Sequence, residues 1–207
     1  VTALNLQTKI LMSQFPEHEA LINLSKGLAR IQHLVTQLLA LAKQDVGLNL
    51  IEPNTEFRLN DVALNCVEQL VNLAMQKEID LGFERNDVIE MNSLESTIHS
   101  IIFNLIDNAI KYTPNQGIIN ISVYSDQDNF ACVQIEDSGV GIDPENYDKV
   151  LKRFYRVHHH LEVGSGLGLS IVDKAIQRLG GTLQLSRSID LGGLSVLVRL
   201  PKILNHH

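Results

Sequence analysis

Mainly apolar side chains recur at spacings of three and four residues through the first 43 positions. This is the repeat of a helix that packs against other helices. The first half of this stripe consists of Val1, Leu4, Thr8, Leu11 and Phe15, and the second half of Leu21, Leu24, Leu28, Ile31, Val35, Leu38 and Ala42. Pro16 separates the halves because proline cannot continue the helical hydrogen-bond ladder. The pattern predicts an antiparallel helical hairpin over residues 1–46.

A single hairpin cannot bury the whole apolar surface of this segment. Leu34 and Leu41 add a flanking apolar row to the second helix. Two hairpins that pair as a four-helix bundle would bury both rows, so we predict a homodimer. The alternative is a hairpin that folds onto the rest of its own chain.

A linker at residues 47–58 follows, where Gly47, Asn49, Pro53 and Asn54 end the heptad pattern. Residues 59–203 then alternate between helical and strand patterns. We expect Asn60 or Asp61 to cap the first helix of this region.

The predicted helices of this second region span residues 60–76, 94–112 and 166–179. Its predicted strands lie near 79–83, 88–91, 118–125, 131–137, 182–186 and 194–200. The fold class is therefore α+β, a helical hairpin followed by an α/β sandwich with helices on one face of the sheet.

Charge and hydropathy argue against a nucleic-acid-binding protein and against a membrane-spanning segment in this sequence. The net charge is −7, without the clustered Lys and Arg that nucleic-acid binding requires. No apolar run approaches the roughly 20 residues that span a bilayer. Cys66 and Cys132 stand alone in apolar surroundings, which favours two buried, reduced thiols.

Three polar residues share one face of the predicted helix 94–112. Asn104, Asn108 and Lys111 are four and three residues apart, so their side chains line up. An amide oxygen can ligate Mg²⁺ without adding negative charge beside phosphates, and Lys111 supplies positive charge. A polar face that simply meets solvent explains these residues equally well.

Asp137, Ser138, Gly139, Val140 and Gly141 follow directly after an alternating strand. The alternation places Asp137 on the interior face, where a carboxylate needs hydrogen-bond donors. The exocyclic amine of adenine is one such donor, and the glycines would let a flat ring approach the backbone. An ordinary strand-to-loop turn is the alternative.

A glycine-rich segment precedes the predicted helix 166–179. It consists of Gly164, Ser165, Gly166, Leu167, Gly168 and Leu169. The unpaired N–H groups of a helix N-terminus bind phosphate. The segment partly matches a dinucleotide-binding fingerprint, but it does not follow a strand in a βαβ unit, so that interpretation fails.

Together these segments resemble the conserved boxes of bacterial sensor histidine kinases. Residues 104–114 are similar to the N box, 137–141 to the first glycine box, 153–156 (Arg153, Phe154, Tyr155, Arg156) to the phenylalanine box, and 164–169 to the second glycine box. The resemblance implies an ATP-binding domain of the GHKL, or Bergerat, type. Residues 2–8 and 37–42 carry a narrower resemblance to sensor kinases that control resistance to polymyxin and cationic peptides.

The resemblance implies a role for each matching residue. Asn108 should ligate Mg²⁺, Asn104 should contact phosphate or the metal's waters, Lys111 should pair with phosphate, and Tyr112 should pack near the nucleoside. The other expected ATP contacts are Asp137, Gly139 and Gly141 at adenine, Gly164, Ser165, Gly166, Leu167, Gly168 and Leu169 at the phosphates, and Arg153 or Arg156 at the γ-phosphate. Residues 146–163 should form a mobile lid.

The family also implies partners and a location. Its kinases pass the γ-phosphate of ATP to a histidine and then to an aspartate of a response regulator. We expect a homodimer that docks such a regulator and forms the cytoplasmic portion of a bacterial inner-membrane protein, reaching the membrane only through upstream segments.

Two alternatives remain: another ATPase of the same nucleotide fold, such as a chaperone or topoisomerase, and a dimeric module that mainly binds the regulator.

The phosphoacceptor histidine of the family precedes the position that aligns with Val1, so we expect it upstream of this chain. His33, His18 and His99 are interpreted as structural or solvated. The run 158–160 is three consecutive histidines, which could bind a transition metal, although adjacent side chains point in different directions.

The chain as given is expected to bind ATP without phosphorylating itself, because phosphoryl transfer to histidine needs the acceptor and its neighbouring acid. The measurement is incubation with γ-labelled ATP followed by alkali and acid treatment. We expect no acid-labile phosphate on the chain. A stable stoichiometric signal would show that another histidine accepts the phosphate.

Overall fold

The computed structural model describes residues 53–157 and 166–203, with isolated positions 11, 18, 20, 21, 24, 27 and 28. The chain divides into two units, Val1–Asn49 and Leu50–His207, and nearly all described residues belong to the second. The predicted hairpin, and the dimer that depends on it, therefore lie almost wholly outside the described residues and stay predictions.

The elements of the second unit follow the predicted alternation of helices and strands. In chain order they are β1 (Thr55–Arg58), α3 (Leu59–Gln76), β2 (Asp80–Asn86), β3 (Glu90–Ser93), α4 (Glu95–Tyr112), β4 (Ile118–Ser125), β5 (Ala131–Asp137), the 3-10 turn η1 (Pro144–Asn146), α5 (Tyr147–Val150), α6 (Gly168–Arg178), β6 (Thr182–Arg187) and β7 (Leu194–Leu200). The predicted bounds of β4, β5 and β7 are confirmed to the residue. Strand β2 runs further than predicted, and β3 begins later.

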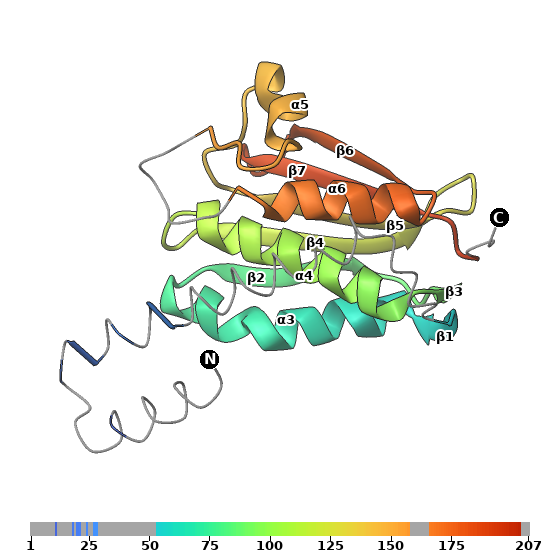
Figure 1. Ribbon diagram of the computed structural model, residues 1–207, viewed down its shortest axis with the longest axis horizontal. Helices are drawn as coiled ribbons and strands as arrows, with labels where there is room; N and C mark the ends of the chain where they lie inside the picture. Colours follow the sequence, from blue (N-terminus) through green and yellow to red (C-terminus); the bar gives the residue numbers. More distant parts are fainter. Residues whose placement is uncertain are drawn as a thin grey trace. The chain divides into compact units, whose positions relative to one another are not determined.

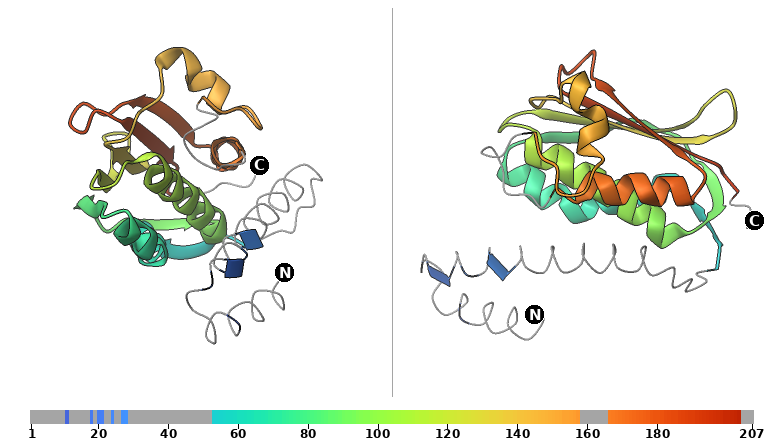
Figure 2. Two further views of the ribbon diagram at one scale, coloured as in Figure 1. Left: turned by 90° about the vertical axis from the view of Figure 1, so that its left-hand side faces the viewer. Right: turned by 45° about the horizontal axis from the view of Figure 1, so that its top comes forward.

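The sheet has five strands in the order β2-β4-β5-β7-β6. β2 and β4 are parallel, joined by a crossover through β3 and α4, and the other neighbours are antiparallel. Helices α3, α4 and α6 lie side by side on one face of this sheet (Figure 1), and Figure 2 shows the sheet and the helices as two layers. The predicted sandwich with helices on one face is confirmed.

The core lies between these two layers. Alternate residues of β4, among them Ile119 and Ile121, are fully buried and face the helices with Ile135 of β5. From the other side α4 contributes Ile102 and Ile106. α4 contacts α3, α6 and β5, so it occupies the centre of the helical layer.

The start of α3 differs from the prediction. The N-cap residue is Arg58 in an extended conformation, with no side-chain cap, so the expectation that Asn60 or Asp61 caps the helix is wrong. The Leu59 N–H instead donates to the Ile89 carbonyl at 2.9 Å. This occurs because β1, which was not predicted, pairs with β3 and delivers the chain directly into the helix. A tertiary hydrogen bond here replaces the local cap.

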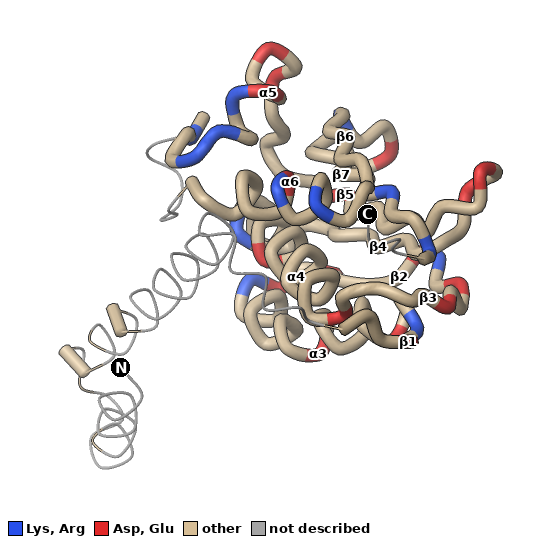
Figure 3. Tube along the Cα trace, turned by 45° about the vertical axis from the view of Figure 1, so that its right-hand side comes forward, with Lys and Arg blue, Asp and Glu red and all other residues tan. Residues whose placement is uncertain are grey.

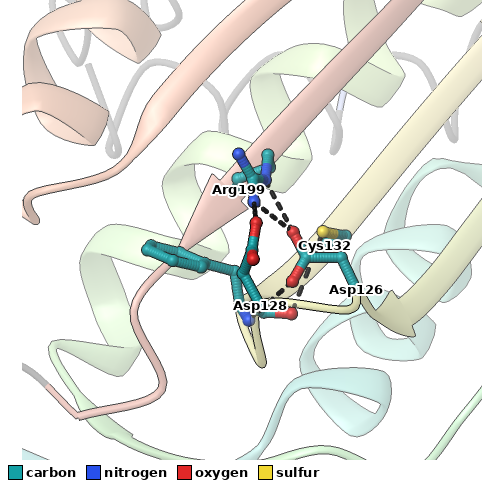
Figure 4. Close-up of polar contacts among 5 residues, drawn as sticks. Asp126, Asp128, Cys132 and Arg199 are labelled. Carbon is teal, nitrogen blue, oxygen red and sulfur yellow. Dashed lines mark hydrogen bonds and ion pairs between the residues drawn. The ribbon is translucent and has the colours of Figure 1, made fainter.

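Arg199 of β7 fastens the turn between β4 and β5. Its Nε donates to Asp126 at 2.7 Å, and its Nη2 donates to Asp128 at 3.0 Å (Figure 4). The guanidinium also lies 4.9 Å from the centroid of the Phe130 ring. Burial opposes ionisation of Asp126, but the Phe130 N–H and Arg199 outweigh it and hold the pKa of Asp126 below its ordinary value. The Arg199 side chain thus holds the β4–β5 turn in place against β7.

The two cysteines are free and buried, as predicted. Burial raises the pKa of Cys66 to about 12, and burial together with the nearby Asp126 charge raises the pKa of Cys132. Both thiols are therefore protonated and unreactive near neutral pH. Within the described segments, no helix combines the length and apolar character needed to cross a membrane.

Ile106→Ala should lower the free energy of unfolding by about 3 kcal/mol, because the deletion leaves a cavity at the centre of the core. Ile106 is 0% exposed, whereas Leu73, on the outer side of α3, is 44% exposed. The matched control Leu73→Ala should cost less than ~1 kcal/mol. Urea unfolding followed by circular dichroism measures both. Equal losses would contradict the central position of α4.

Candidate nucleotide site

The polar face of α4 meets the first turn of α6. A Cβ built on Gly168 would lie 3.1 Å from Nδ2 and 3.4 Å from Oδ1 of Asn108. Gly168 is the first residue of α6, so the N-box helix and the second glycine box lie against each other. Any side chain at Gly168 would press on the Asn108 amide.

The two asparagine side chains of α4, Asn104 and Asn108, differ in their hydrogen bonding. The Nδ2 of Asn104 donates to the Ser100 carbonyl at 2.7 Å, which fixes the amide plane. Asn108 is half-buried, and its side chain has no hydrogen-bond partner among the described residues. A half-buried amide without a partner is costly, so Asn108 fits a position that a metal ion or phosphate would complete.

Lys111 forms an ion pair with Asp107, one helical turn back. Asp107 is buried (8% exposed), and the sequence interpretation did not single it out. The spacing of four residues on one helix was the available signal. Asp107 holds the Lys111 ammonium on the same face of α4 as Asn104 and Asn108.

The N-terminus of α6 presents backbone donors that the helix itself does not pair. Its first N–H groups have no partner within the helix, and no acidic side chain occupies the first turn. The Ser170 hydroxyl donates to the Leu167 carbonyl at 2.8 Å and stabilises that turn. An anion here would gain from these N–H groups and from the helix dipole. Of the predicted phosphate-binding segment, Gly164 and Ser165 lie outside the described residues.

Asp137 ends β5 inside the protein, as the alternation predicted. It is 5% exposed, and its Oδ1 accepts from the Gly139 N–H at 2.8 Å and from the Leu194 N–H at 3.2 Å. Burial raises the pKa of Asp137, and these two N–H groups partly offset the effect. No other described residue bonds this carboxylate, so Oδ2 is left to accept a hydrogen bond from a ligand.

Gly139 joins the Asp137 loop to the end of α4. A Cβ on Gly139 would lie 2.5 Å from the Tyr112 carbonyl oxygen, so only glycine permits this approach. The contact places Tyr112, Asp137 and Gly139 at one end of the helical layer. Gly141 follows with φ +68°, a backbone conformation that favours glycine.

The predicted lid is partly described. Figure 3 shows basic residues along α5 and the segment after it, which carries Lys152, Arg153 and Arg156. At its start the buried Asn146 accepts from the Tyr155 hydroxyl at 3.1 Å. Further along, the Phe154 N–H donates at 3.0 Å to the carbonyl of Gly166, which follows the predicted lid in the sequence. Residues 158–163 lie outside the described residues, and movement of the lid stays a prediction.

Comparison with known proteins agrees with this geometry. Residues 93–203 match the family of histidine kinase-, DNA gyrase B- and HSP90-like ATPases. The chain belongs to this ATPase family. The predicted nucleotide fold is thereby confirmed.

Similar proteins in this ATPase family are sensor kinases. The chain is 32% identical over 195 residues to the sensor protein kinase PmrB of Pseudomonas aeruginosa, covering 93% of this chain and 40% of PmrB. It is 30% identical over 203 residues to the sensor protein QseC of Escherichia coli K12, covering 96% and 44%. The chain thus spans about two fifths of these relatives. The solved catalytic domain of histidine kinase ThkA is similar at TM-score 0.63 and 26% identity, covering 73% of this chain and 99% of that domain.

Besides Asp107, the sequence interpretation missed two residues of this candidate site. Gly193 and Leu194, at the start of β7, pack against Asp137, and the Gly193 N–H donates to the Asp137 carbonyl at 3.1 Å. A Cβ on Gly193 would overlap Asp137 and lie 2.6 Å from the Gly139 nitrogen. The signal was the pair Gly192–Gly193, which was interpreted only as a turn.

The histidines fit the structural interpretation where they are described. His99 lies 3.1 Å from Nε2 of Gln69 and stacks on Phe103. No group of three His, Cys, Asp or Glu within the described ranges is placed to hold a metal ion. The run 158–160, and His33, lie outside those ranges.

Gly193→Ala should lower the free energy of unfolding by roughly 2–3 kcal/mol, because the new methyl group collides with Asp137. The matched control is Gly192→Ala. Gly192 has φ +79° but no atom within 4 Å of a built Cβ, so only backbone strain of about 1 kcal/mol applies. Thermal and urea unfolding of both variants test this. A smaller loss for Gly193→Ala than for Gly192→Ala would contradict the packing.

Proposed function

We propose that this chain binds ATP with Mg²⁺ and that, in a longer protein, it donates the γ-phosphate to a histidine. The observation that carries the proposal is the half-buried Asn108 amide, which has no partner among the described residues and faces the N-terminus of α6. The nucleotide fold of the ATPase family and the sensor kinases among the similar proteins support it.

Asp137 recognises adenine in this proposal. With Oδ1 occupied by two backbone N–H groups, Oδ2 is the oxygen that accepts from the adenine amine. Gly139 and Gly141 leave the backbone beside the ring free of side chains, and Tyr112 packs near the nucleoside. A buried acceptor of this kind discriminates strongly against bases that offer no donor.

The phosphates lie between α4 and the N-terminus of α6. Asn108 is the metal ligand, and its amide oxygen is the ligand type that Mg²⁺ accepts alongside phosphate and water. When bound, Mg²⁺ would neutralise part of the phosphate charge. Asn104 contacts phosphate or the metal's waters, while Lys111 adds a positive charge that Asp107 orients. The N–H groups from Gly164 to Leu169 bind phosphate, and Arg153 or Arg156 contacts the γ-phosphate.

The longer protein would be a sensor histidine kinase of a two-component system. Its histidine would pass the phosphoryl group to an aspartate of a response regulator, and its helical hairpin would form a homodimer. A role in polymyxin or cationic peptide resistance rests on the narrower resemblance carried by residues 2–8 and 37–42. A location at the bacterial inner membrane, with this portion in the cytoplasm, belongs to the same proposal.

Asp137→Asn tests the proposed adenine contact with little change in shape. The new side chain keeps an oxygen for Gly139 and Leu194 but presents an NH₂ group where Oδ2 was. We expect ATP affinity to fall by roughly 10–100-fold, since two donors then face each other. Inosine triphosphate has an acceptor at the same place, so the variant should favour it over ATP. Calorimetric titration measures both, and an unchanged ATP preference would contradict the contact.

The same variant should be at least as stable as the wild type at pH 7 without nucleotide. The raised pKa of Asp137 means that the native state binds the proton more tightly than the unfolded state, whose reference value is 3.8. Wild-type stability therefore falls as pH rises from that value through the raised pKa, and ionised Asp137 weakens the fold at neutral pH. Asparagine removes this cost. Thermal unfolding between pH 4 and 8 measures it, and lost affinity with lost stability would instead indicate misfolding.

A further inference from the structure

The end of α4 lacks a donor that an uninterrupted helix would have. The Thr113 N–H donates to the Ala109 carbonyl at 2.9 Å, and the helix stops there. The next helical bond would come from residue 114 to the Ile110 carbonyl, but Pro114 has no N–H. The last carbonyls of α4 therefore need donors from elsewhere in the chain.

Lys77, just beyond α3, supplies those donors. Its Nζ donates to the carbonyls of Ile110 at 2.9 Å, Lys111 at 2.8 Å and Thr113 at 3.1 Å. The ammonium group thus points at the C-terminal end of α4. The positive charge also lies at the negative end of the helix dipole. Charge-assisted bonds of this kind are stronger than bonds between neutral groups.

The backbone of Lys77 is itself fixed. Its N–H donates to the Ala74 carbonyl at 3.0 Å, and its carbonyl accepts from the Gln116 N–H at 2.9 Å. The Gln116 side chain also donates to Glu78 at 2.8 Å. Both backbone polar groups of Lys77 are therefore hydrogen-bonded, one to α3 and one to the loop after α4, so the residue that holds the end of α4 is itself fixed.

The end of α4 is also where two parts of the nucleotide site meet. It carries Lys111 and Tyr112, and the Tyr112 carbonyl rests against Gly139. The Gly139 N–H in turn donates to Oδ1 of Asp137 at 2.8 Å. A shift of this helix end would therefore move both the predicted phosphate ligand Lys111 and the loop that orients Asp137.

We propose that Lys77 is a positioning residue of the nucleotide site, which orients Lys111, Tyr112 and the Asp137 loop by holding the end of α4. The inference rests on the proposed ATP binding and concerns a residue outside all four sequence boxes. Lys77 touches no nucleotide in it and acts only through α4.

The test uses Lys77→Cys in the full chain, followed by alkylation of the new thiol. Bromoethylamine converts this cysteine into a close lysine analogue, whereas iodoacetamide adds a neutral group of similar size. Cys66 and Cys132 are buried, with raised pKa values, so they should stay unmodified in the folded protein. Mass spectrometry checks single modification.

We expect Lys77→Cys to bind Mg²⁺–ATP roughly tenfold more weakly than the wild type. Bromoethylamine should restore most of this affinity, and iodoacetamide should not. Without nucleotide, hydrogen exchange at the Thr113 amide should quicken in the variant and slow again after bromoethylamine treatment. A role in bulk packing alone would respond equally to both reagents.

Lys202→Cys, treated with the same reagents, is the matched control. Lys202 bonds Asn129 at 2.6 Å beside the β4–β5 turn, at the other end of β4 from the site. Its variant should keep wild-type affinity. Lys77→Arg gives a second test that does not depend on alkylation: its planar group cannot direct donors at all three carbonyls, so its affinity should lie between those of the wild type and Lys77→Cys.

The outcomes separate the two proposals. If the wild type binds ATP and Lys77→Cys binds it equally well, or if both reagents restore binding alike, the role of Lys77 is overturned and ATP binding stands. If Lys77→Arg binds more weakly than Lys77→Cys, the role of the charge is overturned. A wild type that binds no nucleotide overturns the proposed function and this inference with it.

Discussion

The burial of α4 against the sheet is the interaction on which the rest of the structure depends. Ile102 and Ile106 are buried in the core, where α4 packs against β5, while α3 and α6 flank the helix on either side. This burial fixes the rotation of α4 about its axis. Because helical side chains have a fixed angular spacing, the rotation also decides where Asn104, Asn108 and Lys111 point. The core thus sets the orientation of the polar face.

The candidate site is built from backbone groups as much as from side chains. Asp137 is held by the N–H groups of Gly139 and Leu194, and the N-terminus of α6 offers N–H groups to an anion. Backbone donors need the chain to pass closely, which explains the glycines at 139, 168 and 193. The site combines a buried carboxylate with a half-buried amide, two groups that weaken a ligand-free fold and that a bound ligand would complete.

At the other end of the sheet, at the β4–β5 turn, the polar side chains pair with one another. Arg199, Asp126, Asp128 and Phe130 contact one another there, and the guanidinium pairs with both carboxylates (Figure 4). Polar groups that partner each other stabilise a turn, whereas Asn108 and Oδ2 of Asp137, at the end that carries the candidate site, have no hydrogen-bond partner among the described residues. The contrast between the two ends of the same sheet supports the interpretation of the unsatisfied end as a binding site.

Local patterns in the sequence predicted the three long helices α3, α4 and α6 and most strands, and singled out the main candidate site residues, because helical and strand periodicities are properties of neighbouring residues; the short η1 and α5 were not predicted. Asn108, Asp137 and Gly168 were found for the same reason, since each lies at a regular position on an element or at its end. Strand β1 and the start of α3 could not be found this way, because pairing with β3 and a bond to Ile89 define them. Gly193, Leu194 and Lys77 act on residues far away in the chain. Only the tertiary structure decided their roles, since a contact between distant segments leaves no periodic trace in either one.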